Sequence, residues 1–309
     1  MDFGLKNSNY KLAFLITFAV IAAFGCRGVE VSSPVLETRE VNDDLGRTVR
    51  VPVKLDRAIS LAPSLTEMIF AIGAGDRLVG VTTYCNYPAE TASIEKIGDT
   101  QTPNIEKIIA LRPQIVFVST ASQLEAFTKT LEDQGIAVYV SNAKSLDEVF
   151  QSLLHLGELF GTKGKAEELV SNLNGRADQA EHVHTLDEPT AERKNFTRVF
   201  VQISNDPLFT IGRDSFLTEL VAQAGGISVT NDVPTAYPKL SKESAAAMNP
   251  DVIFLSDSED NREASSVFKD SGAVKNGRVY RINADIISRP GPRLVDALEE
   301  IALRLEEKK

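Results

Sequence analysis

The feature that most constrains the fold of this 309-residue chain is an alternation of strand-like and helical segments. In the first half, short apolar runs at residues 57–63, 78–82, 114–119 and 137–141 are separated by segments with helical spacing of apolar residues. Strands that alternate with helices form crossover units, which place the strands parallel in one sheet. Two short polar strands around an Asp-Leu-Gly turn in residues 41–52 precede this pattern and predict a hairpin.

The second half of the chain repeats this alternation. Residues 198–204, 251–256 and 278–283 have the composition of strands, whereas residues 215–226 and 292–307 have the apolar spacing of helices. The sequence therefore predicts an α/β fold with two lobes, each built on a parallel sheet.

Two residue spacings recur in both halves. Each half has a Thr-Glu pair whose glutamate precedes a glycine by six residues, and a further glutamate that precedes a proline by seven. These pairs are Glu67–Gly73 and Glu219–Gly225 for the first spacing, and Glu106–Pro113 and Glu243–Pro250 for the second. The recurrence indicates two lobes built to one plan, although an ordinary helix-strand pattern produces part of the match by itself.

The segment between the two halves is predicted to be helical. Apolar residues recur at helical spacing in residues 146–154 and again in 166–173, with Gly-Thr-Lys-Gly between them. A flexible linker would be rich in glycine, serine and proline. We therefore expect a stiff bridge over residues 146–194 between an N-terminal lobe at 41–145 and a C-terminal lobe at 195–309.

The N-terminus has the pattern of an export signal. Lys6 and Lys11 precede an uncharged apolar stretch at residues 12–24, which is shorter than the ~20 residues needed to cross a bilayer. The stretch ends in Ala-Ala-Phe-Gly-Cys, which resembles a bacterial lipobox. We expect a lipoprotein signal peptide at residues 1–25, lipidation of Cys26, and a tether at 26–40. Ordinary signal cleavage near Gly25 is the alternative, and both interpretations predict export.

The charge of the chain argues against nucleic acid as a partner. The formal net charge is −10, and the sequence has no basic stretch. If Cys26 carries lipid, Cys85 is the remaining thiol and no internal disulfide forms.

Residues typical of catalytic or metal sites have plainer explanations. His182 and His184 point to different faces of a helix, which favours a solvated surface over a metal site. Ser64, three residues before Glu67, is typical of a helix cap and lacks the features of a nucleophile. Cys85 has no histidine near it in sequence and is typical of a small, half-buried apolar residue. We therefore expect no catalytic residue, no metal and no cofactor, and an exported hydrolase remains an alternative.

Loops at the carboxyl ends of the predicted strands contain aromatic residues and an arginine. They hold Tyr84, Tyr87, Phe209, Tyr237 and Arg289. Ligands of open α/β sheets bind at these ends. Aromatic rings also pack over strand ends for structural reasons, so the pattern alone leaves both interpretations open.

Glu106 and Glu243 fall in the first turns of their predicted helices, after Asn104 and Ser241 as expected caps. A carboxylate there gains ~0.3–1 kcal/mol from the helix dipole. Spacing alone favours this structural role, but it does not explain why both halves repeat the same Glu-to-Pro interval.

Several of these stretches together resemble the substrate-binding proteins of ABC importers for iron-siderophores and vitamin B12, and most of all their cobalamin-binding branch. The stretches are DDLGRTVRVP, SLAPSLTE, GVTTYCNYP, NIEKIIALRPQIVFVS and SRPGPRLVDALEEIA. The resemblance covers residues 41–307. It implies a periplasmic binding protein with a helical backbone, in which two α/β lobes are joined by one long helix and the ligand lies in the cleft.

The resemblance also implies roles for individual residues. Tyr84 matches the tyrosine of the family that contacts the corrinoid, and Tyr237 occupies a position where the family has an aromatic residue. Residues 285–289 match the loop that closes over the other side of the ligand. With the residues from the strand-end loops, the expected ligand-binding set is Tyr84, Tyr87, Phe209, Tyr237, Asp285, Ile286, Ile287, Ser288 and Arg289. Glu106 and Glu243 match paired glutamates that dock on arginines of the membrane permease, which accounts for their repeated spacing.

Two departures widen the range of ligands. The chain has no tryptophan, and residues 286–287 are isoleucines where the familiar relatives carry aromatics. Haem or a ferric siderophore is therefore the alternative ligand, and a structural or sensory lipoprotein is a further alternative. The expectation is an exported, lipid-anchored monomer on the periplasmic or cell-surface side of the membrane. It captures a corrinoid, cobalamin in particular, and delivers it to the permease dimer of an ABC importer.

Overall fold

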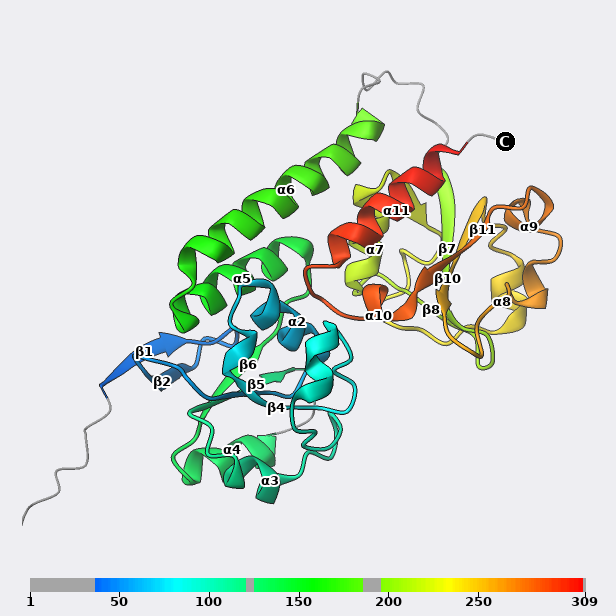
Figure 1. Ribbon diagram of the computed structural model, residues 1–309. Coiled ribbons are helices and arrows are strands. Elements are labelled where there is room, and N and C mark those ends of the chain that lie inside the picture. Colours follow the sequence, from blue (N-terminus) through cyan, green and yellow to red (C-terminus); the bar gives the residue numbers. More distant parts are fainter. Residues whose placement is uncertain (1–36, 121–124, 186–195, 308–309) are drawn as a thin grey trace, which may run out of the picture. The chain divides into compact units, whose positions relative to one another are not determined.

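The computed structural model describes residues 37–120, 125–185 and 196–307 (Figure 1). The expected signal peptide, the lipidation site Cys26 and most of the tether at 26–40 lie outside the described residues, so they stay predictions.

The chain begins with the predicted hairpin. Strands β1 (Thr38–Asn42) and β2 (Thr48–Pro52) pair antiparallel. The carboxylate of Asp43 in the turn accepts the backbone N–H groups of Leu45 at 3.1 Å and Arg47 at 2.9 Å. Gly46 adopts a φ of 75°, a left-handed conformation that favours glycine.

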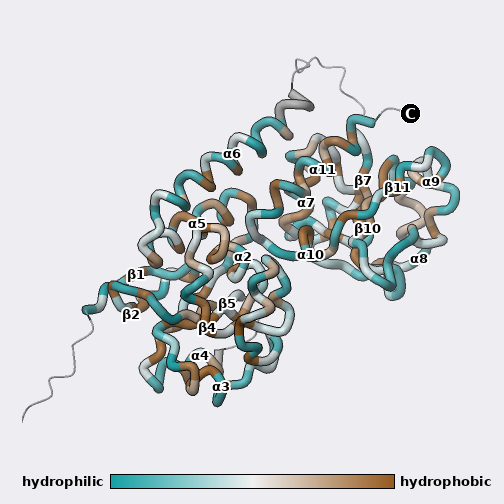
Figure 2. The backbone as a smooth tube through the Cα atoms, in the orientation of Figure 1, coloured by the Kyte–Doolittle hydropathy of each residue, from teal (hydrophilic) through white to brown (hydrophobic). Residues whose placement is uncertain are grey.

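The first lobe contains a four-stranded parallel sheet, as predicted, with strand order β4-β3-β5-β6. Its strands are β3 (Ala58–Ser60), β4 (Leu78–Val81), β5 (Ile115–Ser119) and β6 (Ala137–Ser141). The central strand β5 is buried over four successive residues, because helices cover both faces of a parallel sheet and make its strands uniformly apolar. Brown segments at β4 and β5 in Figure 2 mark this apolar layer.

The α-helices described in this lobe follow the predicted order, whereas its two short 3-10 helices were not predicted. The helices are α2 (Pro63–Ala71), η1 (Gly75–Arg77), η2 (Ala89–Ser93), α3 (Ile105–Ala110) and α4 (Glu125–Asp133). The predicted helix cap at Ser64 is wrong. Helix α2 begins at Pro63 after Ala62, and no side chain caps it. Proline suits this first position because its φ is already helical and it has no N–H that needs a partner.

The second lobe contains a five-stranded sheet with order β11-β10-β7-β8, and β9 also pairs with β7. The strands are β7 (Thr197–Ser204), β8 (Phe209–Thr210), β9 (Gly226–Ser228), β10 (Val252–Asp257) and β11 (Val279–Asn283). Most pairs are parallel, as predicted. The exception is β8, which pairs antiparallel with β7. Phe209 was expected in a loop and instead begins this short strand.

Most helices of the second lobe are short, and the last one is the longest of them. They are α7 (Phe216–Gln223), α8 (Lys242–Ala246), η3 (Ser266–Phe268), α9 (Gly272–Lys275), α10 (Ala284–Ile287) and α11 (Leu294–Glu306). Helix α10 lies where a loop was expected. The Asn283 side chain accepts the N–H of Asp285 at 2.8 Å, which caps this single turn.

Two helices form the bridge predicted between the lobes. Helix α5 (Leu146–Phe160) is capped by Ser145 and ends at Gly161 with a φ of 70°. Helix α6 (Lys163–Thr185) packs against both α5 and α11 (Figure 1). No helix in the described part of the chain combines the length and the apolar character needed to cross a membrane.

The backbone repeats in the two lobes at the positions that the sequence spacings marked. Gly73 and Gly225 follow helices α2 and α7 with φ values of 76° and 83°. Arg112 and Asn249 each precede the proline of the second spacing, and both have positive φ, at 48° and 43°. Positive φ is uncommon outside glycine, so its recurrence at matched positions supports one plan for both lobes.

The bridge is part of a hydrophobic core that continues through both lobes. One buried cluster contains Phe117 of β5, Leu153 of α5, Val170 of α6 and Leu298 of α11. The described residues from 38 onward form one compact unit.

Candidate functional site

A pocket of about 370 Å³ lies at the carboxyl ends of the first sheet. Its walls come from the start of α2, the loops after β4 and β5, and the segment between α10 and α11. The lining residues are Ala62, Pro63, Ser64, Tyr84, Thr100, Gln101, Ser119, Asp285, Ser288, Arg289 and Pro290. Pockets of this size at the strand ends of α/β sheets are typical sites for small molecules.

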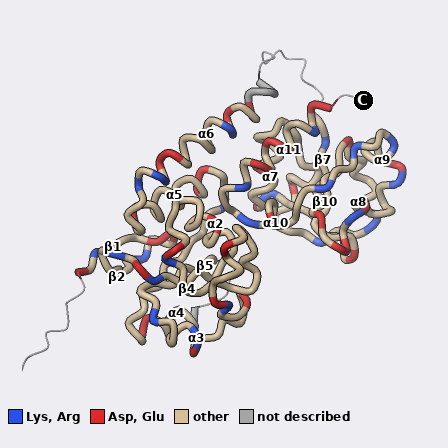
Figure 3. The backbone as a smooth tube through the Cα atoms, in the orientation of Figure 1, with Lys and Arg blue, Asp and Glu red and all other residues tan. Residues whose placement is uncertain are grey.

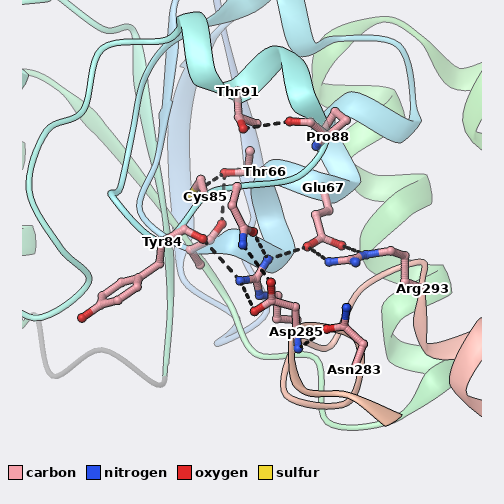
Figure 4. Close-up of polar contacts among 12 residues, drawn as sticks. Thr66, Glu67, Tyr84, Cys85, Pro88, Thr91, Asn283, Asp285 and Arg293 are labelled. Atoms are coloured by element: carbon pink, nitrogen blue, oxygen red, sulfur yellow. Dashed lines mark hydrogen bonds and ion pairs between the residues drawn. The ribbon is translucent and has the colours of Figure 1, made fainter. Parts of the chain in front are cut away.

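Tyr84 combines a fixed backbone with an exposed ring. Tyr84 is 56% exposed, and Figure 4 shows its ring directed away from the polar contacts behind it. The next residue, Cys85, is 1% exposed, and its sulfur accepts the hydroxyl of Thr66 at 3.2 Å. Cys85 is thus more deeply buried than the sequence suggested. Because this neighbour anchors the loop, the Tyr84 ring is held at the pocket without being part of the core.

Glu67 forms a buried ionic contact between the lobes. Its side chain is 2% exposed and belongs to α2 of the first lobe. Arg293, which precedes α11 in the second lobe, donates to it twice, with Nη2–Oε1 at 2.6 Å and Nε–Oε2 at 2.8 Å. Arg289 donates through Nη1 to Oε1 at 3.0 Å (Figure 4). The predicted capping role of Glu67 is therefore wrong, since its carboxylate pairs with two arginines.

Arg289 continues this network to the pocket wall. Its Nη1 donates to Oδ1 of Asn86 at 2.8 Å, and its Nη2 donates to Oδ1 of Asp285 at 2.6 Å and to the carbonyl of Tyr84 at 3.3 Å. Asn86 in turn donates to Oδ2 of Asp285 at 2.8 Å. The arginine thus ties the tyrosine loop of the first lobe to α10 of the second.

Tyr87 is engaged by the same network. The guanidinium of Arg293 lies 4.2 Å from the centre of its ring, a cation–π contact. Burial acts to lower the pKa of Arg293, but the hydrogen bonds and charge of Glu67 outweigh it and the pKa is raised. Tyr87 is 48% exposed but does not line the pocket.

The aromatic residues expected from the second lobe are not among the residues that line the pocket. Phe209 is partly buried in β8 and forms an isolated bridge with Lys239. Tyr237 is 43% exposed in the segment that leads to this bridge. Both residues stay predicted ligand contacts that lie outside this pocket lining.

The two isoleucines of α10 do not share one environment. Ile287 is 2% exposed and belongs to the hydrophobic core, and Ile286 packs against that core while partly buried. Helix α10 rotates successive side chains to different faces, so Asp285, Ser288 and Arg289 reach the pocket but Ile287 does not. The expected ligand contact of Ile287 does not fit this placement.

Glu106 and Glu243 lie at equivalent exposed positions in the two lobes. The predicted caps are present: Asn104 accepts the N–H of Lys107 at 2.9 Å, and Ser241 accepts the N–H of Ser244 at 3.0 Å. Within the described ranges no ion pair involves either glutamate. Elsewhere on the two lobes acidic and basic residues are interspersed (Figure 3).

The pocket offers no nucleophile with a neighbouring histidine among the described side chains. Ser64 lines it, but His155 is exposed on α5. His182 and His184 lie near the end of α6, and their side chains are outside the described part of the structure.

Comparison with known proteins agrees with this fold and site. A sequence profile of the family described as periplasmic binding protein matches residues 59–286. The chain therefore belongs to the periplasmic binding protein family. It is 33% identical over 312 residues to an uncharacterized ABC transporter substrate-binding lipoprotein of Bacillus subtilis (strain 168), covering 96% of each chain.

Three further comparisons concern one sequence relative and two solved structures. The vitamin B12-binding protein of Vibrio cholerae is 29% identical over 257 residues, covering 82% of this chain and 91% of that protein. The crystal structure of the periplasmic vitamin B12 binding protein of V. cholerae matches with a TM-score of 0.69 at 28% identity, over 81% of this chain and 96% of that one. A periplasmic heme-binding protein of Roseiflexus sp. RS-1 matches with a TM-score of 0.70 at 23% identity, over 81% of this chain and 97% of that one, and shows a shared fold.

These findings confirm the predicted fold class and the family resemblance. The chain is an exported substrate-binding component of an ABC importer, which binds a small ligand and passes it to a permease. The family consists of binding proteins and not of enzymes.

Proposed function

We propose that this protein captures a corrinoid, cobalamin in particular, and delivers it to the membrane permease. The observation that carries the proposal is the exposed ring of Tyr84 beside the pocket at the strand ends. A flat macrocycle gains contact from a flat aromatic ring whose position is already fixed, because little side-chain entropy is lost on binding. The similarity to vitamin B12-binding proteins supports this choice of ligand.

The remaining contacts follow from their placement. Serine and threonine hydroxyls and the amide of Gln101 line the pocket and suit the amide groups on the rim of a corrin. Tyr237 and Phe209 of the second lobe are proposed to meet the part of the ligand that extends beyond the pocket, and Tyr87 and Ile286 to lie at its margin. Tyr84 packs on the face of the ring.

Docking to the permease is assigned to Glu106 and Glu243. Both are exposed at the N-terminal turn of a short helix, one in each lobe, and neither has an ion-pair partner within the described ranges. A permease dimer has two-fold symmetry, so a matched pair of carboxylates presents one charge to each subunit.

The N-terminal segment supplies the attachment to the membrane in this proposal. Cleavage after residue 25 and lipidation of Cys26 leave the tether at residues 26–40 before the first lobe. The protein then works as an anchored monomer, with the lobes at 41–145 and 195–309 joined by the bridge at 146–194.

Haem or a ferric siderophore is the second candidate ligand. The exposed phenol of Tyr84 favours it, since a tyrosine oxygen is a known ligand of ferric haem iron. The two candidates differ in what the purified protein retains.

The test is to incubate the protein with cyanocobalamin, haemin and ferric siderophores separately, remove free ligand by desalting, and record absorbance spectra. The proposal predicts retention of one cyanocobalamin per chain and little retention of the other two. Retention of haemin or a siderophore in its place would assign the second candidate. Retention of none by the folded protein would contradict both.

A further inference from the structure

We infer that Glu67, which does not line the pocket, sets the charge of the ligand site and thereby selects uncharged ligands over anionic ones. This inference rests on the proposed function, because it concerns the ligand held at the same pocket. Glu67 acts in it as a positioning and specificity-determining residue that makes no contact with the ligand.

The charges at this pocket balance. Asp285 and Arg289 are the charged residues among those that line it. Arg289 also contacts Glu67, and Glu67 contacts Arg293. The connected cluster therefore holds two carboxylates and two guanidinium groups, and its formal charge is zero.

The arginine at the pocket wall is already occupied. Both terminal nitrogens of Arg289 donate to protein oxygens, on Glu67, Asn86, Asp285 and the Tyr84 backbone. Its side chain is 11% exposed. An anionic group of a ligand would have to compete with these protein oxygens for the guanidinium, and each oxygen that it displaces would lose a charge-assisted hydrogen bond.

The other lining residues recognise polar groups without carrying charge. Ser64, Thr100, Gln101, Ser119 and Ser288 supply hydroxyls and an amide. Such groups pair well with amides and hydroxyls of a neutral molecule. A carboxylate buried among them gains less free energy from these hydrogen bonds than it loses by leaving water. The site therefore discriminates against negatively charged ligands.

A substitution at Glu67 changes the net charge of the cluster without changing a residue that lines the pocket. Glu67 is 3% exposed and lies behind Arg289. Glu67→Gln keeps the shape and the hydrogen-bonding oxygen of the side chain but leaves the cluster with one net positive charge. The affinity for the anionic ligand should then rise relative to the affinity for the neutral one.

The experiment measures affinities for two pairs of ligands whose members differ mainly in charge. The first pair is cyanocobalamin and its derivative with one side-chain amide hydrolysed to a carboxylate. The second pair is haemin, with two propionates, and its dimethyl ester. The readout is the ratio of dissociation constants within each pair for the wild-type protein, Glu67→Gln, and the control Glu168→Gln. Glu168 is exposed on α6 and its substitution changes the total charge by the same amount.

The wild-type protein should bind the neutral corrinoid at least ~10-fold more tightly than its carboxylate. Glu67→Gln should reduce this preference by about 5-fold or more, whereas Glu168→Gln should leave it unchanged. The double variant Glu67→Gln with Arg293→Gln is again charge-balanced and should restore the preference. A purely structural role of Glu67 would not be restored by a second substitution in the same buried contact.

An unchanged preference in folded Glu67→Gln, or its loss in Glu168→Gln, would overturn the inference. If Glu67→Gln does not fold, Arg293→Gln replaces it: Arg293 does not line the pocket, and its loss leaves the cluster with one net negative charge, so the preference for the neutral ligand should increase. If the wild-type protein binds the porphyrins but not the corrinoids, the proposed function fails and the porphyrin pair still tests the charge preference. Binding of neither pair by folded protein would overturn both.

Discussion

Glu67 and Arg293 form a two-point ion pair that joins helix α2 of one lobe to the start of α11 of the other. Their side chains are 2% and 16% exposed, so water screens the pair weakly. The residues are more than two hundred positions apart in sequence. The loop with Tyr84 and the residues around Arg289 depend on this contact, which links the stability of the protein to the geometry of its pocket.

Removing one partner of this pair should be costly. Glu67→Ala removes the carboxylate that Arg293 pairs with and one of the two that Arg289 pairs with, and we expect a loss of ~3–5 kcal/mol in the free energy of unfolding. Urea titration measures it. Arg176→Ala is the matched control, because Arg176 pairs with Asp296 and Glu299 at 2.6 Å where all three side chains are more than a third exposed. That change should cost about 1 kcal/mol or less. Equal losses in both variants would contradict the role assigned to Glu67.

Ionised Glu219 should slightly destabilise the folded protein, in contrast to Glu67, and this effect should depend on pH. Burial, followed by the negative charges of Asp147 and Glu148, raises its pKa in the folded protein. A carboxyl group with a raised folded-state pKa loses stability as pH rises through that pKa, because ionisation is harder in the folded state.

Glu219→Gln should therefore raise the melting temperature at pH 7, with a gain of at most ~0.5 kcal/mol, since the group is exposed. The gain should vanish near pH 3, where the wild-type carboxyl is already protonated. Thermal unfolding at both pH values measures this, with Glu168→Gln as the control. A gain that persists at low pH would show that charge is not the cause.

Tyr84→Ala should weaken ligand binding without unfolding the protein. Tyr84 is 56% exposed, so removal of its ring leaves no cavity in the core, whereas the lost contact should reduce affinity by ~1–3 kcal/mol. Leu303→Ala provides the control, because Leu303 is equally exposed on α11 and outside the pocket. Calorimetry with ligand and melting curves without it separate the two effects. A large drop in melting temperature with unchanged affinity would make Tyr84 a structural residue.

Substitution of both docking glutamates should uncouple binding from transport. Glu106→Ala with Glu243→Ala should bind ligand as the wild-type protein does, since neither residue lines the pocket. Loss of interface charge pairs should cost ~2–5 kcal/mol of the complex with the permease. Uptake in cells should fall, and the double change to arginine should lower it further. Normal uptake with the double arginine variant would contradict the docking role. Both glutamates would then serve only to stabilise their helix termini.

The sequence predicted the parts of the fold that depend on local patterns. Periodic apolar residues marked the parallel strands and both bridging helices, because period and burial are linked directly. The Glu-to-Pro spacing also had a local cause: residues Arg112 and Asn249 before the two prolines share an unusual positive φ. The short elements β8 and α10 were missed, since a turn or two of backbone leaves little periodic signal.

The site was only partly predictable for the same reason. Tyr84, Asp285, Ser288 and Arg289 lie in strand-end segments and do line the pocket. The ionic role of Glu67 depends on distant arginines, and its local context of a serine three residues before imitates a capping box. Only the folded chain brings those charges together.

The central claim, that this pocket binds a corrinoid, is tested most directly by isothermal titration of the purified protein with cyanocobalamin. We expect saturable 1:1 binding with a dissociation constant of about 1 μM or tighter, equivalent to roughly −8 kcal/mol, and weaker binding by Tyr84→Ala. Absence of saturation at about 100 μM cyanocobalamin with folded wild-type protein would contradict it.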